Sequence, residues 1–116
     1  MTLFPLTGQY MAHIIAVPEM ADGQRMIYRS SHLYLLLISV LHLAWATALV
    51  KPPFGLLQKG ISLLLTLSFI ALHYGFFIEA ASGDLERLVT SLGLYGIFAA
   101  GVLMAINLMT NREPPK

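Results

Sequence analysis

The stretch SSHLYLLLISVLHLAWATALV, residues 30–50, holds no charged residue and is bounded by Arg29 and Lys51. An uncharged apolar run of about 20 residues is long enough to cross a hydrocarbon core of roughly 30 Å as an α-helix. Two further apolar runs follow, at residues 60–79, where only the terminal Glu79 is charged, and at residues 88–110. The sequence therefore predicts an all-α integral membrane protein with three transmembrane helices.

The composition supports this class. Of the 116 residues, 57% are hydrophobic and 11% are charged, and the mean hydropathy is +0.72. Soluble domains carry about 25% charged residues, and small ones bury only about two thirds of the surface that the unfolded chain exposes. A formal net charge of +1 gives no indication of nucleic-acid binding, and the absence of cysteine excludes disulfides, thiolate catalysis and cysteine metal sites.

Helix-breaking and capping residues divide the chain into three parts. In residues 1–21, apolar side chains recur at helical spacing and predict a short amphipathic helix in the membrane interface: Leu6, Tyr10, Ile14 and Val17. Residues 22–111 form the predicted three-helix domain, with Asp22 and Asp84 as N-caps and breaks at 51–53 and Gly83. The charged tail, residues 112–116, is predicted to be disordered.

The basic residues differ slightly in number between the two predicted membrane faces. One face holds Arg25, Arg29 and Arg87, and the other holds Lys51, Lys59, Arg112 and Lys116. Because basic residues gather on the cytoplasmic side, we expect a multi-pass protein with its N-terminus outside and its C-terminus in the cytoplasm.

Small residues at close-packing spacing lie on the second and third predicted helices. Helices in lipid associate through small residues that let their backbones approach. The residues in question are Ala71, Gly75, Gly93, Gly96, Ala100 and Gly101. They predict helix packing, either within the chain or against another subunit.

Three histidines lie inside the apolar runs: His32, His42 and His73. Ionisable groups within a membrane are costly and often functional. At 1.5 Å rise per residue, His73 lies between the other two, roughly 7 Å from each in height. We consider two roles: neutral side chains bonded to a neighbouring hydroxyl or carbonyl, or ligands of b-type haem or quinone.

Charged residues gather near one predicted boundary, where Arg29, Glu79 and Arg87 lie at similar depth. Since an unpaired, partly buried carboxylate is expensive, we expect Glu79 to form an interfacial ion pair with one of the two arginines.

The functional prediction follows from what the chain contains. No hydrolase triad, phosphate loop or zinc motif is present. We expect a non-enzymatic accessory or structural subunit of a larger membrane complex, or a homo-oligomer, with the lipid bilayer and other membrane subunits as partners. The alternative is an electron-transfer subunit that binds haem or quinone through its histidines.

Overall fold

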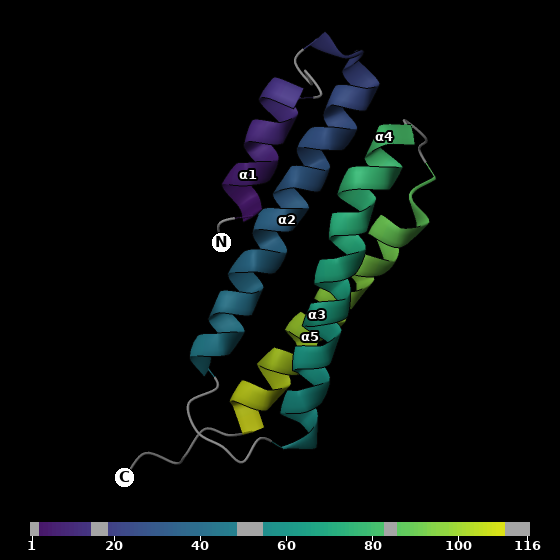
Figure 1. Ribbon diagram of the computed structural model, residues 1–116. Helices are drawn as coiled ribbons and strands as arrows, with labels where there is room; N and C mark the ends of the chain where they lie inside the picture. The colour runs from purple at the N-terminus through teal and green to yellow at the C-terminus, as the bar shows by residue number, and fades with distance from the viewer. Residues whose placement is uncertain (1–2, 15–18, 49–54, 83–85, 111–116) are drawn as a thin grey trace.

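A computed structural model describes residues 3–14, 19–48, 55–82 and 86–110, and this part of the chain contains helices and no strand (Figure 1). The elements are α1 (Leu3–Gln9), the π-helical segment η1 (Tyr10–Ile14), α2 (Asp22–Ala48), α3 (Leu56–Tyr74), the π-helical segment η3 (Gly75–Glu79), α4 (Ala80–Ser82) and α5 (Leu88–Thr110). The predicted breaks at 51–53 and Gly83, the predicted N-cap Asp84 and the tail 112–116 lie outside the described residues.

Three helices are long and apolar enough to cross a membrane. They are Asp22–Ala48, the continuous run Leu56–Ser82 that joins α3, η3 and α4, and Leu88–Thr110. The mean hydropathy of an 18-residue stretch within them is 1.4, 2.0 and 1.9, respectively. The predicted all-helical fold with three candidate spans is therefore confirmed. A polar contact stabilises the first turn of α3: the Gln58 side chain accepts a hydrogen bond from the Gly55 backbone N–H at 2.9 Å.

The buried positions of the long helices alternate in steps of three and four residues. On α5 they are Thr90, Gly93, Ile97, Ala100, Met104 and Asn107. On α3 they are Ile61, Leu65, Ser68 and Leu72, and Gly75 of η3 continues the series. This 3.5-residue spacing is the pattern of knobs-into-holes packing between helices, and it restricts each helix to one narrow buried stripe.

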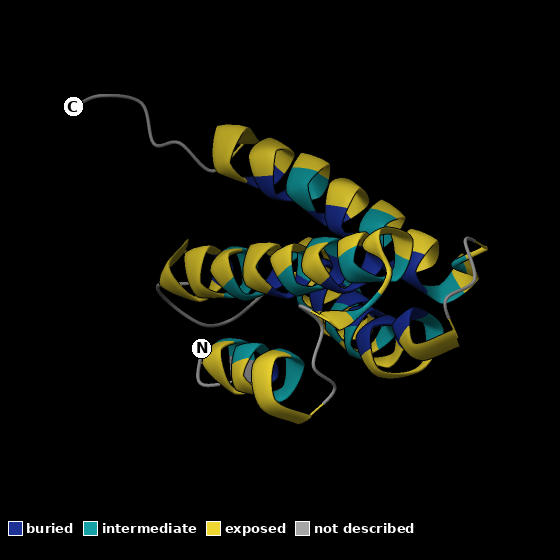
Figure 2. Cartoon of the chain, turned by 90° about the horizontal axis from the view of Figure 1, so that it is seen from above, coloured by how far each residue is buried: buried dark blue, intermediate teal, exposed yellow. Residues whose placement is uncertain are grey.

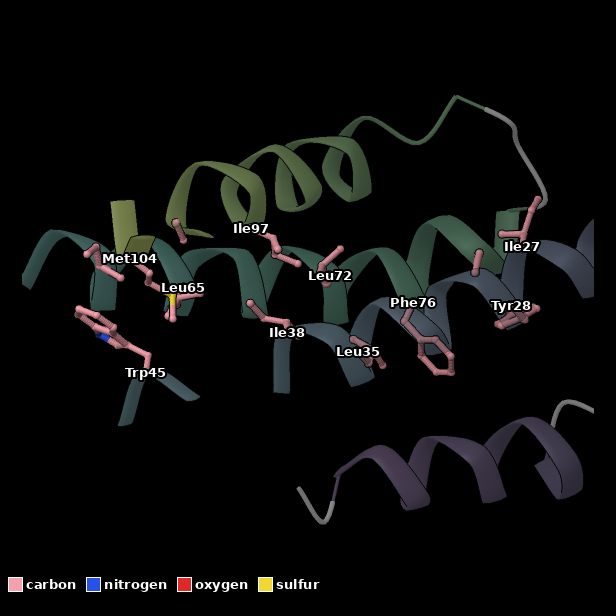
Figure 3. Packing of buried hydrophobic residues seen from close by; sticks show 13 residues of the cluster. Ile27, Tyr28, Leu35, Ile38, Trp45, Leu65, Leu72, Phe76, Ile97 and Met104 are labelled. Carbon is pink, nitrogen blue, oxygen red and sulfur yellow. The ribbon is translucent and has the colours of Figure 1, made fainter. Parts of the chain in front are cut away.

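The core lies where α2 and α5 both pack on α3, and the α3–α5 contact is the more extensive (Figures 1 and 3). Leu35 and Ile38 of α2 belong to one buried cluster with Leu65 and Leu72 of α3, all at most 2% exposed, and Phe76 of η3 is fully buried in the same cluster (Figure 3). The outward faces of the helices are exposed (Figure 2), and many of the exposed residues are large and apolar. A surface of this kind suits lipid contact.

The first helix runs antiparallel to α2 and lies beside it (Figure 1). A helix forms within the predicted N-terminal segment, and it lies along α2 rather than across the end of the bundle. Its contacts with the bundle include Thr7, which is 4% exposed, and the partly buried Tyr10 and Met11. Of the apolar face predicted to lie in the membrane interface, Leu6 and Ile14 are 61% and 73% exposed, and Val17 lies outside the described residues.

Candidate functional site

A polar clamp, which we define as Ser31, Glu79, Arg87 and Thr90, joins the three long helices at one end of the bundle. The Glu79 carboxylate accepts hydrogen bonds from the backbone N–H of Val89 at 2.7 Å, the backbone N–H of Thr90 at 2.9 Å and the Thr90 hydroxyl at 2.6 Å. The first N–H groups of a helix have no partner within the helix. Glu79 thus caps α5 from a different helix, and its negative charge lies at the positive end of the α5 dipole.

The clamp depends on a glycine in the π-helical segment. A Cβ at Gly75 would overlap the Thr90 hydroxyl and would lie 3.2 Å from Glu79 Oε2. The absence of a side chain at this position therefore lets α5 approach closely enough for Glu79 to reach its first turn. Single π-helical turns are frequent at functional sites. This one places both Gly75 and Glu79 against Thr90 of α5.

The interfacial ion pair predicted for Arg29, Glu79 and Arg87 takes a different form. Arg29 is exposed. Arg87 donates to the hydroxyl of Ser31 and, at 3.2 Å, to that of Thr90. Among the described residues, Glu79 is bonded to Val89 and Thr90 rather than to a guanidinium within 4.0 Å. Backbone N–H groups bond the carboxylate directly because the start of α5 lies against Glu79, while Arg87 bonds the Thr90 hydroxyl and acts on Glu79 through its charge.

The histidine nearest the clamp is fixed by the first helix. His32 Nδ1 lies 3.1 Å from Thr7 Oγ1, and the His32 ring stacks on Phe4 with centroids 4.0 Å apart. The Thr7 hydroxyl already donates its hydrogen to the Phe4 carbonyl at 2.8 Å, so it accepts from His32, whose Nδ1 then carries the hydrogen. His32 therefore links α1 to α2.

The other two histidines lie in the seam between α2 and α3: His42 is on α2 and His73 is on α3. His42 Nδ1 is 3.0 Å from the Ile38 carbonyl and His73 Nδ1 is 2.8 Å from the Phe69 carbonyl. The Phe69 ring packs against both imidazoles, with centroid distances of 5.7 Å to His42 and 4.1 Å to His73. The structure therefore brings His42 and His73 to one aromatic side chain and leaves His32 apart from them.

This arrangement bears directly on the predicted haem. Coordination of one iron by both His42 and His73 would require Phe69 to leave its place, because its ring packs against both imidazoles. Bis-histidine haem ligation thus does not fit the side-chain arrangement around Phe69.

The predicted small residues fall into two groups. Against α3, a Cβ at Gly93 would lie 2.9 Å from Leu72 Cγ and 3.4 Å from Ala71 Cβ, and one at Gly96 would overlap the Ser68 hydroxyl. Ala100 is fully buried, whereas a Cβ at Gly101 would meet nothing within 4 Å. Hence the glycines at 75, 93 and 96 serve the α3–α5 contact, and Gly101 faces away from it.

Sequence reasoning missed three polar residues that carry the inter-helix bonds: Thr7, Ser31 and Thr90. Thr7 lies in α1 and the other two lie in apolar runs, and each is at most 4% exposed. A further contact joins Trp45 Nε1 to the Ser62 hydroxyl at 2.9 Å, again between α2 and α3. Thr90 and Ser31 fall on the three–four buried stripes, and that spacing is the one signal that could have indicated them.

Comparison with known proteins adds no relative: no family model, curated protein or solved structure matches this chain.

Proposed function

We propose that this chain is a small integral membrane protein that acts as a non-enzymatic structural subunit, either within a larger membrane complex or as a homo-oligomer. The three apolar helices support insertion in a bilayer. The polar contacts of the clamp support a structural role for the buried hydroxyls and for Glu79, since each of them is bonded within the bundle.

The observation that carries the proposal is a small-residue pair on the outward side of α5. Gly101 has no atom near the position of a Cβ, and Ala105, one turn further on, is exposed. The bulky residues Tyr95 and Phe98 of the same helix are 73% and 74% exposed. A small-xxx-small pair lets a further helix approach closely in lipid, and within the described part of the chain no atom lies within 4 Å of a Cβ built at Gly101.

The experiment is a mass measurement in mild detergent, with identification of co-purifying proteins by mass spectrometry. We expect a complex heavier than one 12.8 kDa chain, and we expect Gly101→Leu to reduce it to the single chain. Gly60→Leu is the matched control, because a Cβ at Gly60 also meets nothing within 4 Å. A wild-type protein that is a monomer without a partner would contradict the proposal.

The proposed orientation, with the N-terminus outside and the C-terminus in the cytoplasm, has a direct test. The natural chain has no cysteine, so a single introduced cysteine is labelled without background. Ser82→Cys and Lys59→Cys lie at opposite ends of the second candidate span. A membrane-impermeant maleimide on intact cells should label the first and spare the second, and the reverse pattern would overturn the orientation.

A second candidate function, electron transfer through a bound quinone, is favoured by the pairing of His42 and His73 around Phe69. Analysis of the lipid extracted with the purified protein tests it, and a preparation without quinone would contradict it. Haem ligation by the same two histidines does not fit their arrangement, so a Soret band that is lost in His42→Ala would overturn this account of the site.

A further inference from the structure

The seam between α2 and α3 brings two histidines from antiparallel helices to one aromatic ring. Side chains on a helix lean toward its N-terminus. Because α2 and α3 run in opposite directions (Figure 1), His42 and His73 lean toward each other along the seam. Both imidazoles meet the Phe69 ring, and all three side chains are partly exposed rather than sealed in the core.

The hydrogen bonds of the two imidazoles determine where their hydrogens lie. A backbone carbonyl is an acceptor only, so Nδ1 of His42 donates to Ile38 and Nδ1 of His73 donates to Phe69. In a neutral imidazole the other ring nitrogen is then an acceptor. Each histidine therefore presents a lone pair at Nε2.

Neither of these lone pairs is used within the described part of the chain. His73 Nε2 is buried without a hydrogen-bond partner, and His42 Nε2 has none among the residues described and is not sealed from the surface. A buried polar atom without a partner is rare, and it destabilises the folded state. In hydrocarbon no bulk water can satisfy it, so the seam is short of a hydrogen-bond donor.

We propose that the seam formed by His42, Phe69 and His73 binds the reduced headgroup of a lipid-soluble quinone, a hydroquinone whose phenolic hydroxyls donate to the Nε2 atoms. The hydroquinone matches the seam in two respects: it supplies O–H donors, and its ring can stack beside the Phe69 ring. The oxidised quinone has carbonyl acceptors alone, so it cannot satisfy an imidazole lone pair. The site therefore favours the reduced form.

This inference deepens the quinone form of the second candidate function, and it is independent of the structural-subunit proposal. The mass measurement tests the subunit proposal, whereas ligand binding tests the inference about the seam. A monomer that binds hydroquinone would support this inference and overturn the subunit proposal. An oligomer that does not bind hydroquinone would support the subunit proposal and overturn this inference.

The test titrates the purified full chain in nanodiscs with decylubiquinol under anaerobic conditions, and in parallel with decylubiquinone and with decanol. Quenching of the single tryptophan, Trp45, which lies one helical turn from His42, reports binding, with equilibrium dialysis as a second readout. We expect saturable decylubiquinol binding, at least about tenfold tighter than that of the quinone, which is the ratio that one hydrogen bond of about 1.4 kcal/mol provides.

Variants locate the site. His42→Leu and His73→Leu should each weaken decylubiquinol binding about tenfold, whereas His32→Leu, which removes a histidine engaged with Thr7 outside the seam, should leave it unchanged. Equal affinity for quinol and quinone in the wild-type protein would overturn the inference without reliance on any variant. Binding of decanol as tight as that of decylubiquinol would also overturn it, because an aliphatic alcohol supplies the donor without the ring.

Discussion

The substitution Gly75→Ala tests the reasoning about the clamp most sharply, because a single methyl group is added where α5 meets the second span. The new Cβ would overlap the Thr90 hydroxyl and would lie 3.2 Å from Glu79 Oε2 and 3.3 Å from Thr90 Cβ. The hydroxyl cannot turn aside at no cost, since it donates to Glu79 at 2.6 Å and accepts from Arg87 at 3.2 Å.

The expected loss follows from these contacts. Overpacking of a tight contact costs about 1–3 kcal/mol, and loss of a hydrogen bond to a charged group adds about 1.5–3 kcal/mol if the hydroxyl turns away. Replacement of glycine by alanine in a helix returns about 0.5–1 kcal/mol. The helical control Gly60→Ala, whose Cβ meets open space, returns the same amount, so this gain cancels in the comparison. We therefore expect Gly75→Ala to lower the free energy of unfolding by about 1–6 kcal/mol relative to Gly60→Ala.

The assay is denaturation by sodium dodecyl sulfate in mixed micelles, followed through the fluorescence of Trp45, which is buried at 3% exposure. A second background separates the steric cause from others: in Thr90→Ala the overlapping hydroxyl is gone, so Gly75→Ala should cost much less there than in the wild-type chain. If Gly75→Ala is as stable as Gly60→Ala, or costs the same in both backgrounds, the account of the clamp is refuted.

Three further variants probe the other inter-helix bonds. Glu79→Gln keeps the shape of the side chain but turns one acceptor oxygen into a donor beside three donors, and it should cost about 1.5–3 kcal/mol in the same denaturation assay; a neutral effect would show that the charge is not needed at the start of α5. Ser62→Ala leaves the buried Trp45 N–H without its acceptor, so we expect a loss of about 1–3 kcal/mol and an altered tryptophan emission maximum; unchanged emission and stability would contradict this bond. Thr7→Val removes the acceptor for His32 and should release α1, seen as faster hydrogen exchange in residues 3–14 with little change in α5; exchange equal to that of the wild type would contradict the role of Thr7.

The three candidate spans could be read from the sequence because their signal is local. Each apolar run is continuous, and its length alone matches the thickness of a bilayer core. Glycine at positions 93 and 96 was also recognisable, since small residues at this spacing are the usual means of close approach between helices in lipid. The sequence could not predict which glycines face a neighbouring helix. Gly101 has the same spacing, but a Cβ built there meets nothing within 4 Å.

The partner of Glu79 could not be read from the sequence. Charge complementarity suggested an arginine, but the start of α5 offered two backbone N–H groups and a hydroxyl at the same place. Likewise the apolar spacing of the N-terminal segment gave no indication that Thr7 would bond to the imidazole of His32. In both cases the polar contact joins residues that are far apart in the sequence, so a local pattern could not predict it.

The sequence by itself determined that the chain is helical, how many of its helices can span a membrane, and which polar groups lie within them, because hydrophobicity and helix length depend on neighbouring residues. Only the tertiary structure decided which of these polar groups meet. Arg87 and Ser31 are 56 positions apart, and Thr7 and His32 are 25 apart. Contacts over such separations depend on the rotation and depth at which the helices pack, and every hydroxyl in an apolar run is an equally good candidate until that packing is known.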